Sequence, residues 1–188
     1  EERRQLYHTK RLRPGTKRYH WVDTLYALSE VSVYAAVVDE LDRRGVPPDY
    51  DELFSDVRRC IDMAHRDGSI LDAILADLPR YVVRDPDLAP TLHKLRSAGK
   101  RLFLLTNSHW KYTDRMMSYL LDGQIAEYGS WRAYFDLVVT SAGKPDFFTK
   151  SQPFQEVLPD GTLRPVTNLE RGKIYAGGNI VELERLLG

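Results

Sequence analysis

The sequence has little cysteine, no net charge and no long apolar run. Its one cysteine, Cys60, can form neither an intramolecular disulfide nor a cysteine-rich metal site, which favours a reducing compartment. Because 27 Lys and Arg balance 27 Asp and Glu, a protein whose main work is to coat nucleic acid is disfavoured. Apolar runs stay below the ~18 residues that a transmembrane helix needs, and no signal-peptide core follows Glu1. We therefore expect a cytoplasmic protein with neither a membrane nor a nucleic-acid partner.

The composition is that of a globular chain. Of 188 residues, 43% are hydrophobic and 29% are charged, which excludes wholesale disorder and a fibrous structure. At roughly 100–200 residues per domain, this length allows one domain, or a core with a modest second lobe. The chain is therefore long enough to bury a sizeable core.

The first 80 residues carry helical patterns and no strong strand signal. Apolar residues recur at helical spacing over 24–44, and the turn at 45–48 ends that pattern with a glycine and two prolines. A second helix is predicted over 50–65. A third is predicted over 70–78, and Ser69 is a natural N-cap for it.

Beyond this point the pattern changes to helices that alternate with short apolar runs. The expected elements are a helix over 86–98, a strand over 101–105, a helix over 111–121, a strand over 135–139, a hairpin-like excursion around Asp160-Gly161, a strand over 173–176 and a last helix through Leu187. An apolar run on each side of a helix indicates a βαβ unit and a parallel sheet. The predicted fold class is therefore α/β, with a helical front half.

Two polar loops follow successive predicted strands. Thr106-Asn107-Ser108 offers hydroxyls, an amide and backbone N–H groups just before a helix, a setting that suits an anion. In the second loop, Gly143 lets the backbone turn and Lys144 would point a cation at the same edge of the sheet. A hydroxyl and a lysine that converge can stabilise a phosphoryl group. The alternative is structural, because Thr-Asn-Ser is also a common N-cap sequence and a lysine before proline is often just exposed.

These loops belong to a longer series of motifs. The series comprises Asp23-Thr24-Leu25-Tyr26, Asp56-Val57-Arg58, Tyr81-Val82-Val83, Phe103-Leu104-Leu105-Thr106-Asn107-Ser108, Lys111-Tyr112-Thr113-Asp114, Tyr134-Phe135-Asp136, Gly143-Lys144-Pro145-Asp146-Phe147-Phe148 and Tyr175-Ala176-Gly177-Gly178-Asn179. The series closely resembles the purine 5′-nucleotidase branch of the haloacid dehalogenase (HAD) superfamily, over nearly the whole chain after about residue 19. The resemblance implies a partial HAD-like core, a Rossmann-type parallel sheet, over 83–188 and a mostly helical cap region over 1–82. It also implies hydrolysis of purine nucleoside monophosphates such as IMP or GMP through an aspartyl-phosphate, with Mg²⁺ as cofactor.

The resemblance assigns catalytic roles to two residues in the loops. Thr106 matches the second HAD motif, whose hydroxyl binds the transferring phosphoryl group, and Asn107 and Ser108 match phosphate and substrate contacts. Lys144 matches the third motif, the cation that holds the charges of the nucleophile and the phosphate in place.

The resemblance also assigns nucleotide contacts to the front half. Arg58 and Asp62, four residues apart on one predicted helical face, match contacts to the purine nucleotide, and His65 lies one turn further. Tyr26 matches an aromatic position beside the base. Without the resemblance, Arg58 and Asp62 would be interpreted as a surface ion pair. Leu71 departs from the family, where a substrate-contacting lysine can occur.

The nucleophile motif of HAD phosphatases, Asp-x-Asp-x-Thr, does not occur in the sequence. Asp23-Thr24-Leu25 and Asp160-Gly161-Thr162 resemble only its second half, and the latter is better interpreted as a turn. The fourth motif, which supplies carboxylate ligands for Mg²⁺, is also missing. We therefore expect an internal piece of a longer protein, inactive by itself, with a strand position of the core left open and no metal ligands in this chain.

Two other functions stay open from sequence. One is a catalytically inactive, nucleotidase-like protein that binds a nucleotide or a partner, as Leu71 and the missing acids would allow. The other takes the basic stretch through Arg18 as a contact for nucleic acid or for a nucleotide effector near Arg13. A homo-oligomer is a further assembly that the resemblance allows.

Overall fold

The computed structural model of the chain describes residues 22, 25 and 27–187, and it divides into two units after Ser69. We refer to residues 1–69 as the first unit and to residues 70–188 as the second. The division falls earlier in the chain than the boundary after residue 82 that the resemblance suggests, which stays a prediction. Within the described residues, no helix has the length and hydropathy that crossing a membrane requires.

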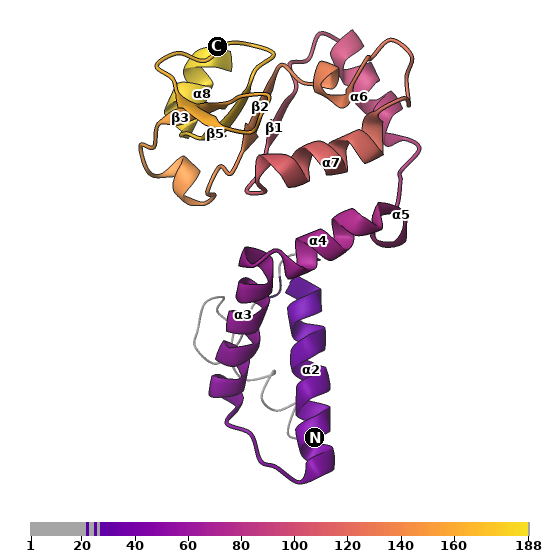
Figure 1. The fold of residues 1–188 in the computed structure, drawn as a ribbon, viewed down its shortest axis with the longest axis vertical. Helices are drawn as coiled ribbons and strands as arrows, with labels where there is room; N and C mark the ends of the chain where they lie inside the picture. Colours follow the sequence, from indigo (N-terminus) through magenta and orange to yellow (C-terminus); the bar gives the residue numbers. More distant parts are fainter. Residues whose placement is uncertain (1–21, 23–24, 26, 188) are drawn as a thin grey trace, which may run out of the picture. The chain divides into compact units, whose positions relative to one another are not determined.

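The described part of the first unit is a pair of helices that lie side by side (Figure 1). They are α2 (Ala27–Arg44) and α3 (Tyr50–Arg66), which confirms the two helices expected here. The Asp49 side chain caps α3 by accepting hydrogen bonds from the first free N–H groups of the helix. The Tyr34 and Phe54 rings meet edge to face with centroids 5.7 Å apart, and Val57 is buried, so the apolar faces pack together.

Two short features after α3 differ from expectation. Helix α4 (Ser69–Ala76) begins at Ser69 itself, and the Ser69 hydroxyl donates to the Asp67 carboxylate at 2.6 Å. A nearby carboxylate is a stronger acceptor than the serine hydroxyl, so Asp67 holds this turn. Helix α5 (Leu78–Tyr81) was not predicted, because four residues are too few to show a helical period.

The second unit contains one mixed sheet of five strands with helices on its faces (Figure 1). The strands are β1 (Phe103–Leu105), β2 (Leu137–Thr140), β3 (Phe154–Val157), β4 (Leu163–Pro165) and β5 (Ile174–Gly177). The later helices are α6 (Leu88–Ser97), α7 (Trp110–Leu121) and α8 (Ile180–Leu187), and two short 3₁₀ turns are η1 (Trp131–Tyr134) and η2 (Asp146–Phe148). The strand order is β1-β2-β5-β3-β4. Strands β1, β2 and β5 run parallel, whereas β3 is antiparallel to β5 and β4, which confirms an α/β fold of Rossmann-like type.

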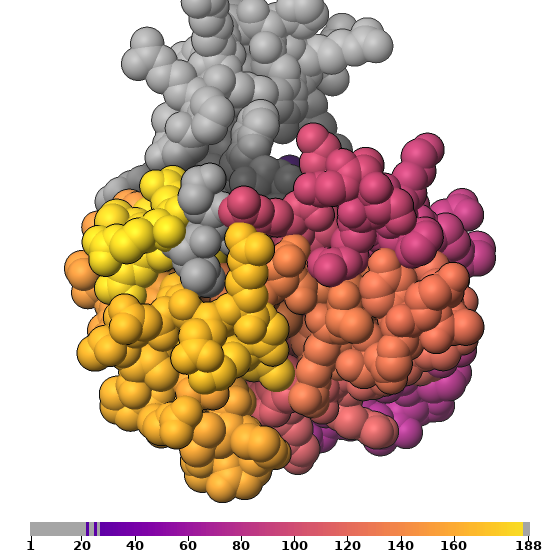
Figure 2. All heavy atoms as spheres, turned by 90° about the horizontal axis from the view of Figure 1, so that it is seen from above, coloured from indigo at the N-terminus to yellow at the C-terminus, as the bar shows by residue number. Residues whose placement is uncertain are grey.

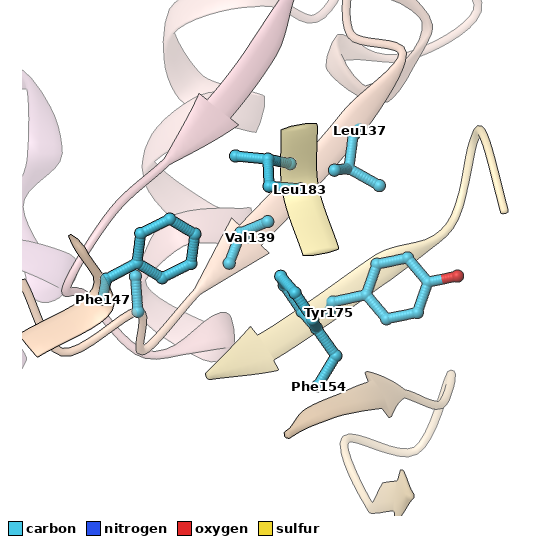
Figure 3. Close-up of a cluster of buried hydrophobic side chains, with 7 residues drawn as sticks. Leu137, Val139, Phe147, Phe154, Tyr175 and Leu183 are labelled. Carbon is cyan, nitrogen blue, oxygen red and sulfur yellow. The ribbon is translucent and has the colours of Figure 1, made fainter. Parts of the chain in front are cut away.

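Each face of the sheet has its own buried cluster, because successive side chains of a strand point to opposite faces. The cluster on the α8 side contains Leu137, Val139, Ala142, Phe147, Phe154, Tyr175 and Leu183 (Figure 3). The other cluster joins the sheet to α6, α7 and η1 and contains Ala89, Leu121, Trp131, Tyr134 and Val138. In the space-filling view, the segments after β2, in orange to yellow, lie against the magenta to coral segments before it (Figure 2). The two clusters fix β1 and β2, whose ends carry the polar loops.

The Gly177-Gly178-Asn179 element has a structural explanation. Asn179 is buried, accepts a hydrogen bond from the Glu182 N–H at 3.1 Å and donates one to the Gln152 carbonyl at 2.8 Å. Gly178 has φ +89°, and a Cβ there would overlap the ring of Phe154. The backbone therefore passes so close to the core that only glycine fits.

We expect Gly178→Ala to lower the free energy of unfolding by at least about 2 kcal/mol, since it adds both overpacking and a strained φ. Phe154 is only 1% exposed and cannot swing into solvent to make room. The matched control is Gly129→Ala, because nothing lies within 4 Å of its added Cβ and its φ is not positive. Denaturant unfolding of both variants measures the difference, and equal losses would contradict this packing.

Candidate active site

The two polar loops meet at the carboxyl ends of β1 and β2, as predicted. Pairing continues past the strand ends, because the Thr106 N–H donates to the Val139 carbonyl at 2.9 Å and the Ala142 N–H donates to the Thr106 carbonyl at 3.0 Å. The Ser141 N–H then donates to the Ser108 carbonyl at 2.9 Å. The loop after β1 is therefore tied to the loop after β2 through the backbone.

Thr106 organises its own loop. Its Oγ1 accepts a hydrogen bond from the Ser108 N–H at 3.0 Å, and the residue is partly buried. The hydroxyl hydrogen is not used in this bond, so the same side chain keeps a donor for an anion.

Lys144 is held at three points by the last residue of β1 and the loop that follows it. Its backbone N–H donates to Asn107 Oδ1 at 2.7 Å, and its carbonyl accepts from Asn107 Nδ2 at 2.9 Å. Its Nζ donates to the Leu105 carbonyl at 3.0 Å. Among the described residues, no carboxylate forms an ion pair with Lys144, so two of the three ammonium hydrogens remain for other acceptors.

The start of α7 tests the structural alternative for Thr-Asn-Ser, that it caps the helix. The N-cap of α7 is His109, whose Nδ1 accepts from the Tyr112 N–H at 3.3 Å. The Thr113 hydroxyl adds a bond to the His109 carbonyl at 3.0 Å. Thr106, Asn107 and Ser108 therefore do not cap the helix, and no sequence pattern indicated that a histidine would. Burial raises the pKa of the Tyr112 phenol, which thus stays protonated at neutral pH.

A cleft of about 570 Å³ lies beside these loops, and sequence patterns did not identify it. Its lining includes His109, Lys111, Arg115, Thr140, Ser141, Asp160 and Ala176. These residues come from α7, from the ends of β2 and β5 and from the β3–β4 hairpin, which only the sheet topology brings together. Asp160 lies in the hairpin turn, where the Thr162 hydroxyl, and then the Thr162 N–H, donate to it and lower the pKa of its carboxyl. The turn interpretation of Asp160-Gly161 is thereby confirmed.

The candidate nucleotide contacts of the front half lie on α3 in the first unit. Arg58 pairs with Glu30 of α2 at 3.6 Å, whereas Asp62 lies 4.0 Å from Arg66. The surface ion pair between Arg58 and Asp62 is therefore not formed. The ring Nδ1 of His65 is 2.8 Å from the Ile61 carbonyl.

The roles of Arg58, Asp62 and His65 in binding a substrate stay predictions. Tyr26 and Arg13 lie outside the described residues, as does the partial motif at Asp23-Thr24. Leu71 is partly buried on α4.

The donor set of the loops does not make a magnesium site by itself. Mg²⁺ prefers carboxylate oxygens and water, whereas these loops offer a lysine, hydroxyls and an amide. Within the part of the chain that the structure describes, no three His, Cys, Asp or Glu side chains are grouped so that they could hold a metal. The site thus suits an anion rather than a cation.

The fold and the site together define a class of protein. This is an α/β protein of Rossmann-like type, with a cation and hydroxyls at the carboxyl edge of two parallel strands. The chain belongs to the 5′ nucleotidase family, whose family model matches residues 1–188.

Similar proteins agree with this family. The chain is 33% identical to 5′-nucleotidase domain-containing protein 2 of Rattus norvegicus over 165 residues, which is 86% of this chain and 29% of that protein. It is 33% identical to the Homo sapiens protein of the same name, covering 86% of this chain and 31% of that protein. A 5′-nucleotidase domain-containing protein of Dictyostelium discoideum is 32% identical over 160 residues, or 83% of this chain and 27% of that protein. The chain thus spans less than a third of these relatives.

We expect Thr106→Val to lower the free energy of unfolding by about 1 kcal/mol, because the Ser108 N–H loses its acceptor while side-chain shape is kept. The matched control is Thr167→Val at an exposed position with no side-chain hydrogen bond to the described residues, where a change within about 0.5 kcal/mol is expected. Denaturant unfolding measures both changes. A Thr106→Val variant as stable as the control would show that this hydroxyl does not hold the loop.

Proposed function

We propose that the protein to which this chain belongs is a HAD-type 5′-nucleotidase that hydrolyses purine nucleoside monophosphates such as IMP and GMP. The observation that carries the proposal is Lys144, a cation without a carboxylate partner among the described residues, fixed beside Thr106 at the carboxyl edge of β1 and β2. A preorganised cation and a hydroxyl donor at one point suit a phosphoryl group. Membership of the 5′ nucleotidase family supports the same reaction class.

In the reaction that the resemblance implies, an aspartate carboxylate attacks the phosphorus and the bond to the nucleoside 5′-oxygen breaks. The leaving oxygen takes a proton from a second aspartate, and water then hydrolyses the aspartyl-phosphate to free phosphate. In this scheme the Lys144 ammonium balances the charge of the carboxylate and the phosphoryl oxygens, and the Thr106 hydroxyl donates to a phosphoryl oxygen. Ser108 provides a second hydroxyl in the same loop. Both aspartates would come from residues outside this chain.

The position of β1 supports a nucleophile that comes from elsewhere in the protein. Strand β1 is at the edge of the described sheet and pairs there only with β2. A further parallel strand on its open side would end next to Thr106 and Lys144, where a carboxylate could pair with the Lys144 ammonium. We propose that the Asp-x-Asp-x-Thr strand occupies this place. Unpaired edge groups favour such pairing.

Magnesium enters the proposal only through the family resemblance. The loops of this chain do not fit Mg²⁺, so its carboxylate ligands would belong to the same outside segments as the nucleophile. Recognition of the purine nucleotide is assigned to Arg58, Asp62, His65 and Tyr26.

The first test compares this 188-residue chain with the longer protein that contains it. We expect the longer protein to release phosphate from IMP or GMP in a reaction that requires Mg²⁺, whereas the 188-residue chain releases none. Malachite-green detection of phosphate measures both, with the reaction mixture without protein and heat-treated protein as blanks. Turnover by the chain alone would overturn the assignment of the nucleophile to outside residues. If the longer protein binds IMP without turnover, the inactive, nucleotide-binding function is favoured instead.

In the longer protein, we expect Lys144→Ala to lower kcat by about 10²–10³-fold, as the loss of one preorganised electrostatic group does. Nucleoside binding should change far less, because Lys144 acts on the phosphoryl group. Lys100→Ala is the control, since Lys100 is exposed and has no side-chain partner among the described residues. Steady-state kinetics with IMP measure kcat and KM separately. An unchanged kcat would remove Lys144 from the mechanism.

A further inference from the structure

The side chain of Asn107 binds both ends of the Lys144 residue. Its Oδ1 accepts the Lys144 N–H at 2.7 Å, and its Nδ2 donates to the Lys144 carbonyl at 2.9 Å. The two residues are 37 positions apart, so the contact is tertiary rather than a local turn. We call this pair of hydrogen bonds the amide clamp.

The amide clamp needs a donor and an acceptor side by side on one short side chain, and a primary amide provides both. A hydroxyl is too short to reach both groups, a carboxylate has no donor for the carbonyl, and an alanine has neither a donor nor an acceptor. The clamp fixes the backbone of Lys144, while the Leu105 carbonyl fixes its Nζ at 3.0 Å. Both anchors belong to the end of β1 and the loop that follows it, which also carries Thr106. The lysine cation and the threonine hydroxyl are therefore held by one short segment.

Because Asn107 is exposed, we infer that the amide clamp matters more for the position of Lys144 than for the free energy of unfolding. The residue is exposed, and hydrogen bonds that water can replace contribute little to the free energy of unfolding. A small displacement of a charged group at a reacting centre, in contrast, has a large effect on rate.

We propose that Asn107 is a positioning residue that acts through Lys144, and that it places the lysine cation against the phosphoryl group. This inference rests on the proposed function for its effect on rate, but the clamp itself is tested without turnover. It differs from the role that the family resemblance implies, in which Asn107 contacts phosphate or substrate directly.

A double-mutant cycle in the longer protein separates the two roles, because residues that act through one another are not additive. The variants are Asn107→Ala, Lys144→Ala and their combination, with Asn168→Ala as the control at an exposed asparagine of the second unit. We expect Asn107→Ala to lower kcat by about 10²-fold, as a displacement of about 1 Å does, and to leave KM nearly unchanged. In the Lys144→Ala background, the same substitution should change kcat by less than about twofold. Multiplicative effects, or a loss confined to KM, would overturn the proposal in favour of direct contact.

Hydrogen exchange on the 188-residue chain tests the clamp independently of turnover. In Asn107→Ala, the Lys144 amide should exchange about tenfold faster, since it has lost its acceptor. The Val139 and Tyr175 amides of the sheet serve as internal controls for folding. Unchanged exchange at Lys144 would overturn the clamp even if the enzyme is active. Faster exchange at Lys144 in a protein whose longer form has no phosphatase activity would support the clamp while refuting the proposed function.

Discussion

The parallel pairing of β1 with β2 is the constraint on which the site depends. Parallel strands must end at the same edge, so their following loops meet even though 31 residues separate Leu105 from Leu137. The register continues beyond the strands through the bonds of Thr106 to Val139 and of Ala142 to Thr106. A shift of this register by one residue would turn every strand side chain to the opposite face and separate the loops.

The two buried clusters maintain that pairing from opposite faces. Leu137 and Val139 pack toward α8, whereas Val138 packs toward α7 and η1. A strand that is apolar on both faces cannot slide without exposing one set of side chains to water. The positions of the polar loops therefore depend on buried residues that are not themselves part of the site. These residues hold the strands in register, and the strands hold the loops.

The two polar loops offer groups of one chemical kind. They offer the Lys144 cation and hydroxyl donors beside β1, the edge strand of the described sheet, and no carboxylate of the described residues forms an ion pair with Lys144. The chain spans less than a third of the length of these relatives. The proposed Asp-x-Asp-x-Thr strand would supply both a carboxylate for Lys144 and a pairing partner for the open edge of β1.

Local periodicity and turn residues were enough to predict α3, α7, the parallel strands and the hairpin at Asp160-Gly161, because neighbours in sequence determine them. The polar ends of two successive strands were also enough to place Thr106 and Lys144 at one edge. The strand order of the sheet could not be predicted from sequence, because no local pattern indicates that β5 pairs between β2 and β3. For the same reason sequence patterns missed the adjacent cleft and the pairing of Arg58 with Glu30. The His109 cap is local, but it was missed because histidine is not among the residues preferred at an N-cap.

The sequence by itself therefore determined the residue types of the site and the strands that present them. Only the tertiary structure decided how they are held: the Asn107 amide lies on Lys144 because two loops far apart in sequence share one sheet edge. Hydrogen bonds of this kind depend on distances set by packing, and no pattern along the chain encodes them.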